Sequence, residues 1–445
     1  MSVRDIHSVK ESASTEASPP GPVSLKMDPH VSPEDYAKAR EQGRVARVSF
    51  SFGDEAGVVP DSDIREFLKQ EHFFISRYDD VIAALLDARI SSDPRTAMSP
   101  EQQKKLPQVP EELRPISRSL LSLDPPDHTR LRKLIQPSFT PRAMEALRSR
   151  IQRIAEDLVD AAERAAAERG ETGPERHMDL ISEFAYPLPV KVISDMLGIP
   201  PEDRDMVKGW TENLVRNNNG RGMMDPENRA KMREFTDYLR RLFADRRKQP
   251  ADDMISQLLL MEEDGDKLNE EETLSTVFIL YLAGHVTTVN LIGNGVFALL
   301  RHPDQLAKFK ADPGLAKGLV EETLRYWGPV DLISRRIAKE DMELAGTHFP
   351  KGEPMMFGLA SANRDPQRFS HPDDFDITRP DADKHVAFGK GIHICIGAPL
   401  ARMEGQIAFE TLFRRLPELR LAVPADEVRW SNSFLRGFAK LPVLF

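Results

Sequence analysis

The single cysteine of this chain, Cys395, lies in a glycine-rich loop directly before a predicted helix. A lone cysteine is ordinarily a small buried hydrophobe, but the residues around this one favour another interpretation. Gly391 permits a positive φ or a close backbone approach, and Gly397 leaves room for a flat ligand against the backbone. Pro399 suits the first turn of a helix. Because the dipole and free N–H groups of a helix N-terminus favour a thiolate, Cys395 can ligate a soft metal centre there.

The loop resembles a known family signature. Phe388, Gly391, Cys395 and Gly397 fill the pattern Phe-x-x-Gly-x-x-x-Cys-x-Gly, which is similar to the haem-binding loop of the cytochrome P-450 monooxygenases. The resemblance covers about residues 44–445. It implies Cys395 as the axial iron ligand of haem b (heme, iron protoporphyrin IX), with a thiolate that pushes electron density toward O–O cleavage. The implied fold is mainly α with a small β-rich region, the single triangular cytochrome P-450 fold.

Composition narrows the class of protein. Forty per cent of the 445 residues are hydrophobic, which is enough for one large core, and 71 acidic against 61 basic residues argue against nucleic acid as the main partner. One cysteine leaves no disulfide and no iron–sulfur cluster within this chain. The first twenty residues lack the apolar core of a signal peptide, and the apolar runs elsewhere are too short and interrupted to span a bilayer. We therefore expect a soluble cytoplasmic monomer without a membrane anchor, with a disordered leader at residues 1–30 and one haem domain at residues 31–445.

A long central helix is predicted from residue 270 to about residue 301. Asn269 and Glu272 have the spacing of a capping box, and His302-Pro303 ends the pattern. At 1.5 Å per residue the helix is ~48 Å long and crosses the whole molecule.

The middle of that helix holds a glycine, Gly284, which costs about 1 kcal/mol relative to alanine. Two reasons are open: room for a ligand beside the helix, or a small-residue packing contact with Thr287 bonding back to a carbonyl of its own helix. The resemblance identifies Ala283, Gly284 and Thr287 with the oxygen-activating motif of the family, in which Thr287 relays protons. Val286 departs from that motif, because an acidic residue usually precedes the threonine.

Four basic residues are candidates for binding haem propionates. His128 and Arg132 share a helix face because they are four residues apart; alone, that pair suggests a solvent-facing surface. The resemblance assigns both to the propionates, together with Arg336 on a predicted strand and His393 in the cysteine loop.

The sequence holds several Glu-x-x-Arg pairs with helical spacing. The pair Glu322/Arg325 lies at the family distance upstream of Cys395, and Arg379 matches the second arginine of a buried network that supports the cysteine loop. We expect the other two pairs, Glu111/Arg114 and Glu145/Arg148, to be exposed.

The remaining elements are predicted as follows. Residues 44–52 and 73–77 form an N-terminal sheet with a helix at 80–86, whereas the proline-rich stretch 92–118 is a loop. Residues 332–338 and 353–357 are strands, the second placed toward a sheet edge by Pro354, and residues 428–434 and 437–443 form a hairpin whose tip enters the substrate pocket. The resemblance places pocket residues in 92–118, 217–224, 277–287, 328–334 and 431–438.

The implied reaction inserts one oxygen atom of O2 into a lipophilic small molecule, by hydroxylation or epoxidation, with a polyketide-like natural product as one substrate class. Because the chain has neither a flavin fingerprint nor iron–sulfur cysteines, electrons must come from a separate ferredoxin and its NAD(P)H-dependent ferredoxin reductase. Lys390, Arg130 and Lys133 are candidates for attracting an acidic ferredoxin, although each also suits a solvated surface. A peroxide-driven peroxygenase and a haem-binding sensor remain as alternatives.

Overall fold

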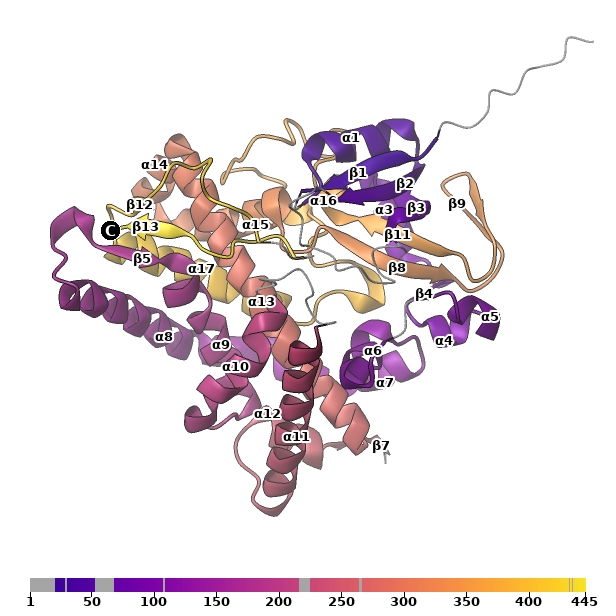
Figure 1. Ribbon diagram of the computed structural model, residues 1–445, viewed down its shortest axis with the longest axis horizontal. Helices are drawn as coiled ribbons and strands as arrows, with labels where there is room; N and C mark the ends of the chain where they lie inside the picture. The colour runs from indigo at the N-terminus through magenta and orange to yellow at the C-terminus, as the bar shows by residue number, and fades with distance from the viewer. Residues whose placement is uncertain are drawn as a thin grey trace, which may run out of the picture.

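The structure is a computed structural model that describes residues 21–28, 30–52, 68–106, 109–215, 225–263, 266–431, 433 and 435–445. Its ribbon has a roughly triangular outline, with helices filling the left and lower parts and a sheet at the upper right (Figure 1). This arrangement confirms the predicted fold class, mainly α with a small β-rich region. The helices are α1 (Pro33–Gln42), α3 (Tyr78–Leu86), α4 (Pro94–Ala97), α5 (Pro100–Gln103), α6 (Arg114–Ser117), α7 (Asp127–Ile135), α8 (Pro141–Glu168), α9 (Pro187–Leu197), α10 (Arg204–Val215), α11 (Pro226–Lys248), α12 (Met254–Leu260), α13 (Glu270–Arg301), α14 (Pro303–Ala311), α15 (Ala316–Trp327), α16 (Leu359–Ala362) and α17 (Ala398–Arg415).

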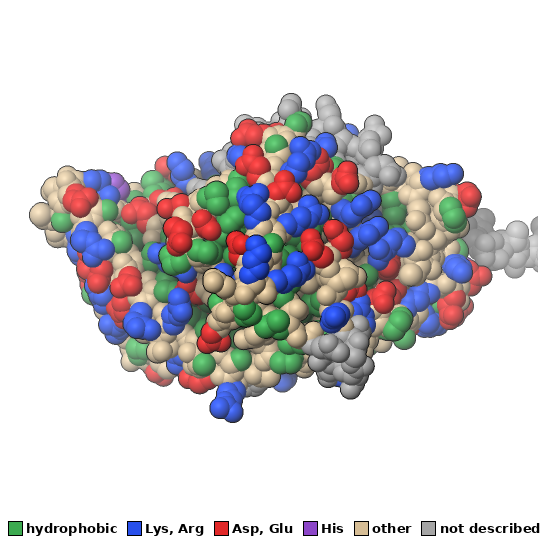
Figure 2. All heavy atoms as spheres, turned by 90° about the horizontal axis from the view of Figure 1, so that it is seen from below, with side chains coloured by type: hydrophobic (Ala, Val, Ile, Leu, Met, Phe, Trp, Pro, Cys, Tyr) green, Lys and Arg blue, Asp and Glu red, His purple; other side chains and the backbone are tan. Residues whose placement is uncertain are grey.

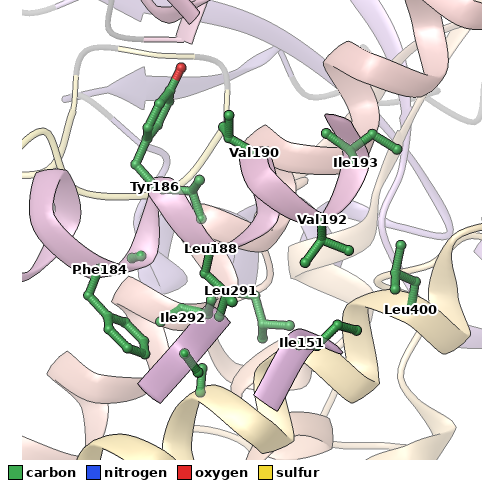
Figure 3. Close-up of a cluster of buried hydrophobic side chains, with 14 of the residues drawn as sticks. Ile151, Phe184, Tyr186, Leu188, Val190, Val192, Ile193, Leu291, Ile292 and Leu400 are labelled. Atoms are coloured by element: carbon green, nitrogen blue, oxygen red, sulfur yellow. The ribbon is translucent and has the colours of Figure 1, made fainter. Parts of the chain in front are cut away.

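Helix α13 is the central element, as the sequence predicts. Asn269 Oδ1 accepts the Glu272 N–H, and Glu272 Oε2 accepts the Asn269 N–H, both at 2.9 Å. The helix packs against α6, α9, α15 and α17. Figure 3 shows the resulting core: side chains of α9 such as Leu188 point toward Leu291 and Ile292 of α13, with Ile151 of α8 and Leu400 of α17 beside them.

One premise of the sequence analysis, that the apolar runs are too short and interrupted to span a bilayer, does not hold for α13. An 18-residue window of α13 is long and apolar enough to cross a bilayer, although 72% of that window is buried inside the protein. Burial of most of this window in the core is a sufficient explanation of its hydrophobicity.

The main sheet has the strand order β1-β2-β3-β11-β8-β4. Phe73 and Ile75 of β3 pack into one hydrophobic cluster and Phe74 into another, because successive side chains of a strand point to opposite faces. The strands of this sheet are β1 (Val23–Met27), β2 (Val45–Phe52), β3 (His72–Ile75), β11 (Pro354–Gly358), β8 (Leu332–Ala338) and β4 (Ile90–Ser91). Smaller sheets pair β9 (Met342–Leu344) with β10 (Thr347–Phe349), β6 (Glu262–Glu263) with β7 (Asp266–Lys267), and β13 (Pro442–Leu444) with both β12 (Arg420–Leu421) and β5 (His177–Asp179).

Two predictions about the sheet are wrong. The leader does not extend to residue 30, because Val23–Met27 pairs with β2 and buries Leu25 and Met27. Strand β11 is an interior strand between β3 and β8, not an edge strand. Pro354 is tolerated there because it is the first residue of the strand.

Two further predictions, a loop at residues 92–118 and a C-terminal hairpin, also differ from the structure. The stretch 92–118 contains short helices rather than a loop, since Pro94 and Pro100 occupy first turns that Asp93 and Ser99 cap. The C-terminal hairpin is reduced to a bridge between Trp430 and Phe438, while β13 pairs elsewhere. Residues 432 and 434 of the first predicted hairpin strand lie outside the described residues.

Candidate functional site

The cysteine loop has the left-handed backbone conformation that Gly391 predicts. Gly389 and Gly391 have φ values of 68° and 70°, in the left-handed region. A Cβ at Gly391 would lie 2.5 Å from the backbone oxygen of Leu85, so any side chain there would clash. The Cys395 N–H donates to the Phe388 carbonyl at 2.9 Å, which closes the loop.

The Cys395 thiol lies at the N-terminus of α17. Burial raises the pKa of this thiol, whereas the N–H groups of Gly397 and Ala398 and the Arg132 and Arg402 guanidinium groups favour the thiolate. The residue nevertheless keeps exposed surface. Among the described residues, a Cβ at Gly397 would meet only Cys395 Sγ within 4 Å, at 3.9 Å. Protein packing therefore does not require glycine here, but a flat group beside the sulfur would.

The four predicted basic residues come together. The rings of His128 on α7 and His393 in the cysteine loop have centroids 4.3 Å apart. Burial, followed by the charges of Arg336, His128 and Arg132, lowers the pKa of His393 to about 3. Burial also lowers the pKa of Arg336 to about 10. Both ring nitrogens of His128 are buried without a hydrogen-bond partner. Crowded, desolvated cations and an unpaired imidazole suit an anionic ligand, so the residues present fit the thiolate and propionate contacts of haem.

The centre of α13 has an open face. Ala283 is exposed and Gly284 and Thr287 are partly exposed, although most of the neighbouring residues of this core helix are buried. Thr287 Oγ1 donates to the Ala283 carbonyl at 2.9 Å, and a Cβ at Gly284 would lie 3.1 Å from Ile193 Cδ1. The structure therefore shows the small-residue packing contact and the bond from Thr287 to its own helix. It also shows an uncovered surface on the same helix that a ligand can contact.

His285 faces away from that surface. It is fully buried, its Nδ1 lies 2.6 Å from the Tyr281 carbonyl oxygen, and burial lowers its pKa to about 4. A neutral ring held among Tyr186 and Tyr281 supplies no proton on the Thr287 side.

Glu404 of α17 is a functional candidate that sequence reasoning missed. Both carboxyl oxygens are buried without a hydrogen-bond partner, and burial raises the pKa to about 8, an effect that the hydroxyl of Thr288 only partly offsets. The sequence signal was present, because Glu404 shares the apolar face of its helix with Leu400 and Ile407 at i,i+4 and i,i+3 spacing.

The predicted Glu–Arg network supports the site. Arg325 Nε and Nη2 donate to Glu322 at 2.7 and 2.8 Å, with both side chains fully buried, and Arg379 Nε donates to Glu322 at 3.3 Å. In contrast, Glu145 and Arg148 form an exposed pair. Glu111 and Arg114 are exposed as well. The choice among the three pairs is confirmed.

A second carboxylate network near the cysteine loop was not predicted. Arg402 of α17 donates two hydrogen bonds to Glu321, at 2.6 and 2.9 Å, and His385 Nε2 lies 3.1 Å from the same carboxylate. Burial opposes ionisation of Glu321, but these partners hold its pKa at about 2. The Arg402 guanidinium also lies 4.6 Å from the centre of the Phe388 ring, so this network fixes the start of the loop.

The predicted pocket segments are partly brought together. Val330 pairs with Leu435, which joins 328–334 to 431–438. Ser275 of α13 donates to the Pro115 carbonyl, which joins α13 to 92–118. The predicted segment 217–224 lies outside the described residues.

The proposed basic contacts for a ferredoxin are not equivalent. Arg130 forms an ion pair with Glu272 and so joins α7 to the start of α13. Lys390 is exposed beside the cysteine loop. On the face seen in Figure 2, basic and acidic side chains are interspersed, so that face lacks the continuous basic surface that nucleic-acid binding requires.

Known proteins resemble this chain over most of its length. A model of the family described as Cytochrome P450 matches residues 221–312 and 314–438. Cytochrome P450 CYP107DY1 of Priestia megaterium is 44% identical over 382 residues, covering 83% of this chain and 88% of its own. Polyketide biosynthesis cytochrome P450 PksS of Bacillus subtilis is 44% identical over 372 residues, with the same coverage. The crystal structure of myxobacterial CYP267B1 in complex with myristic acid superposes with a TM-score of 0.79 at 40% identity, covering 94% of this chain and 96% of its own. With the Cys395 loop and the Glu322 network in place, these similarities show that the chain belongs to the cytochrome P450 family of haem-dependent monooxygenases.

Proposed function

We propose that this monooxygenase binds haem b through Cys395 and inserts one oxygen atom of O2 into a lipophilic small molecule. The observation that carries the proposal is the Cys395 thiol at the start of α17, beside the desolvated cluster of His128, Arg132, Arg336 and His393. Cys395 supplies the thiolate, and the four basic side chains bind the propionates by charge-assisted hydrogen bonds. Phe388, Gly391 and Gly397 shape the loop against the flat face of the ring. When bound, haem supplies the redox chemistry that activates dioxygen.

The open face of α13 provides the reaction site for the substrate. Ala283 and Gly284 leave space beside the helix, and Thr287 presents a hydroxyl at Oγ1 that can hold or pass a proton. Val286 can do neither. Without an acid at residue 286, three routes are open: water alone carries protons to Thr287, a substrate hydroxyl completes the chain, or the enzyme is slow and releases peroxide. General acid assistance is typically worth about 10²–10⁴ in rate.

A polyketide-like natural product is the substrate class that we propose. PksS is named for polyketide biosynthesis, and CYP267B1 was crystallised with a fatty acid; both names describe lipophilic molecules. A panel of macrolactones and fatty acids, scored by the shift of the Soret band, tests this proposal. Polar ligands alone shifting the band would contradict it.

Electrons come, in this proposal, from a separate ferredoxin and its NAD(P)H-dependent reductase, because the only cysteine of the chain is Cys395. Exposed Lys390, next to the cysteine loop, is a candidate contact for an acidic ferredoxin. We further propose a cytoplasmic monomer with a single haem domain. The burial of α13 supports only the location outside a membrane, and size-exclusion chromatography tests the oligomeric state.

The decisive experiment is spectroscopic. The ferrous–CO complex should show the red-shifted Soret band of a thiolate-ligated haem, and Cys395→Ala should abolish that band. Turnover with ferredoxin, reductase and NAD(P)H is then compared with turnover on peroxide alone. Product only with peroxide would favour a peroxygenase, and a band without any turnover would favour a haem sensor.

A further inference from the structure

A buried ion pair joins the C-terminal loop to the segment that leads into β8. Arg436 Nε and Nη2 donate to the two carboxylate oxygens of Asp331 at 2.9 and 2.8 Å. The side chains are only 10% and 6% exposed. A planar guanidinium bound at two points fixes orientation as well as distance, so this pair holds the backbone of each segment in one position.

The backbone of residue 436 is anchored on two further sides. Its N–H donates to the Pro329 carbonyl at 2.8 Å. Its carbonyl accepts from Asn294 Nδ2 of α13 at 3.1 Å, and the same amide donates to the Trp327 carbonyl at 2.9 Å. Val330 and Leu435 pair beside these contacts. Residues 327–331 and 435–438 thus form one unit with α13.

This unit borders the open face of α13. Asn290 and Asn294 follow Thr287 by three and seven residues, so all three share one side of the helix. A Cβ at Gly437 would lie 2.1 Å from Asn290 Oδ1, which means that the loop backbone lies directly on the helix one turn beyond Thr287. A shift of the loop by a fraction of an ångström would change the wall of the space beside Thr287.

A buried ion pair is by itself weak evidence for stability, and it can instead hold two segments in one arrangement. Replacing such a pair by apolar residues is often neutral or stabilising. The nearby His30 does not compete for Asp331 as a cation, because burial, followed by the charge of Arg436, lowers its pKa to about 3. The Asp331 carboxylate is therefore left to Arg436 alone as its cationic partner among the described residues.

We propose that Asp331 and Arg436 are positioning residues that determine substrate specificity, by fixing residues 327–331 and 435–438 as one wall of the pocket beside Thr287. The inference rests on the proposed function, since it assumes that the substrate occupies the space beside α13. The pair acts through the backbone of the wall and does not touch the reacting atoms.

The test compares Asp331→Asn and Arg436→Lys with a matched control, Asp253→Asn. Asp253 is equally buried, at 6% exposure, and pairs with Arg246 at 2.6 Å at the start of α12. Two probes are titrated into each ferric protein: imidazole, which reports access to iron, and econazole, whose bulky aromatic body also reports the pocket walls. Arg436→Lys keeps the charge but loses the two-point contact, so it remains informative if Asp331→Asn does not load haem.

We expect both pair variants to bind econazole at least about tenfold more weakly, because a displaced wall loses contacts with its bulky body, with imidazole binding within about twofold. Amide hydrogen exchange should rise in residues 327–331 and 435–438. The control should lose stability without either change. Unchanged econazole binding, equal weakening of both probes, or the same pattern in Asp253→Asn would overturn the inference. Failure of the proposed function is distinguishable, because the wild-type ferrous–CO band would then be missing. In that case hydrogen exchange in residues 327–331 and 435–438 would still test whether the ion pair anchors these segments.

Discussion

Replacing Glu322 by alanine should remove a large part of the stability of the haem-loaded protein. The substitution deletes both hydrogen bonds to Arg325, the bond from Arg379 and the bond from the Asp376 N–H at 2.9 Å. Arg325 would remain fully buried with only the carbonyls of Asn363, Pro372 and Asp374 as partners. Breaking a buried pair in this way costs about 3–5 kcal/mol, a large part of the roughly 5–15 kcal/mol that separates folded from unfolded proteins.

The measurement is the urea midpoint and the haem content per chain for Glu322→Ala, Glu322→Gln and Glu145→Ala. Glu145 pairs with Arg148 at 2.8 Å but is 63% exposed, so its loss should cost no more than about 1 kcal/mol. Glu322→Gln keeps the volume and removes the charge, which separates packing from the ion pair. Equal midpoints and haem contents for all three variants would refute the reasoning.

Four further substitutions test the site: Glu404→Gln, Thr287→Ala, Val286→Glu and Gly391→Ala. Burial holds the pKa of Glu404 at about 8, above the ordinary carboxyl value of 4.5, so the folded chain retains a proton that the unfolded chain has released between these pH values. The free energy of unfolding should therefore fall as pH rises through that window. Urea melts at a series of pH values should show a smaller fall for Glu404→Gln. An unchanged dependence of the unfolding free energy on pH would show that another group titrates. Thr287→Ala should divert electrons from product to hydrogen peroxide, and an unchanged ratio of product to NAD(P)H would show that this hydroxyl is not the relay. Val286→Glu should raise the product formed per NAD(P)H with a simple apolar substrate. Gly391→Ala should give protein with little haem, because its Cβ meets the Leu85 carbonyl and its φ is positive, and normal haem loading would mean that the loop adjusts without loss.

The cysteine loop and the central helix could be predicted because their determinants are local. Positive φ at Gly391 and the capping box at Asn269 depend on a few consecutive residues. Both were observed at the expected positions. The edge prediction failed at Pro354 because a proline is also tolerated as the first residue of an interior strand. The neighbours of that strand, β3 and β8, come from distant parts of the chain.

The amino-acid sequence by itself determined the thiolate loop, the length of α13 and the family of the protein. Only the tertiary structure decided which polar groups lose water and which partners they then find. Arg436 meets Asp331 across 105 residues, and Glu404 becomes an unpaired acid because α17 turns that face into the core. Burial is a property of the packed molecule, and it changes the charge state and interaction strength of a side chain whose identity the sequence alone specifies.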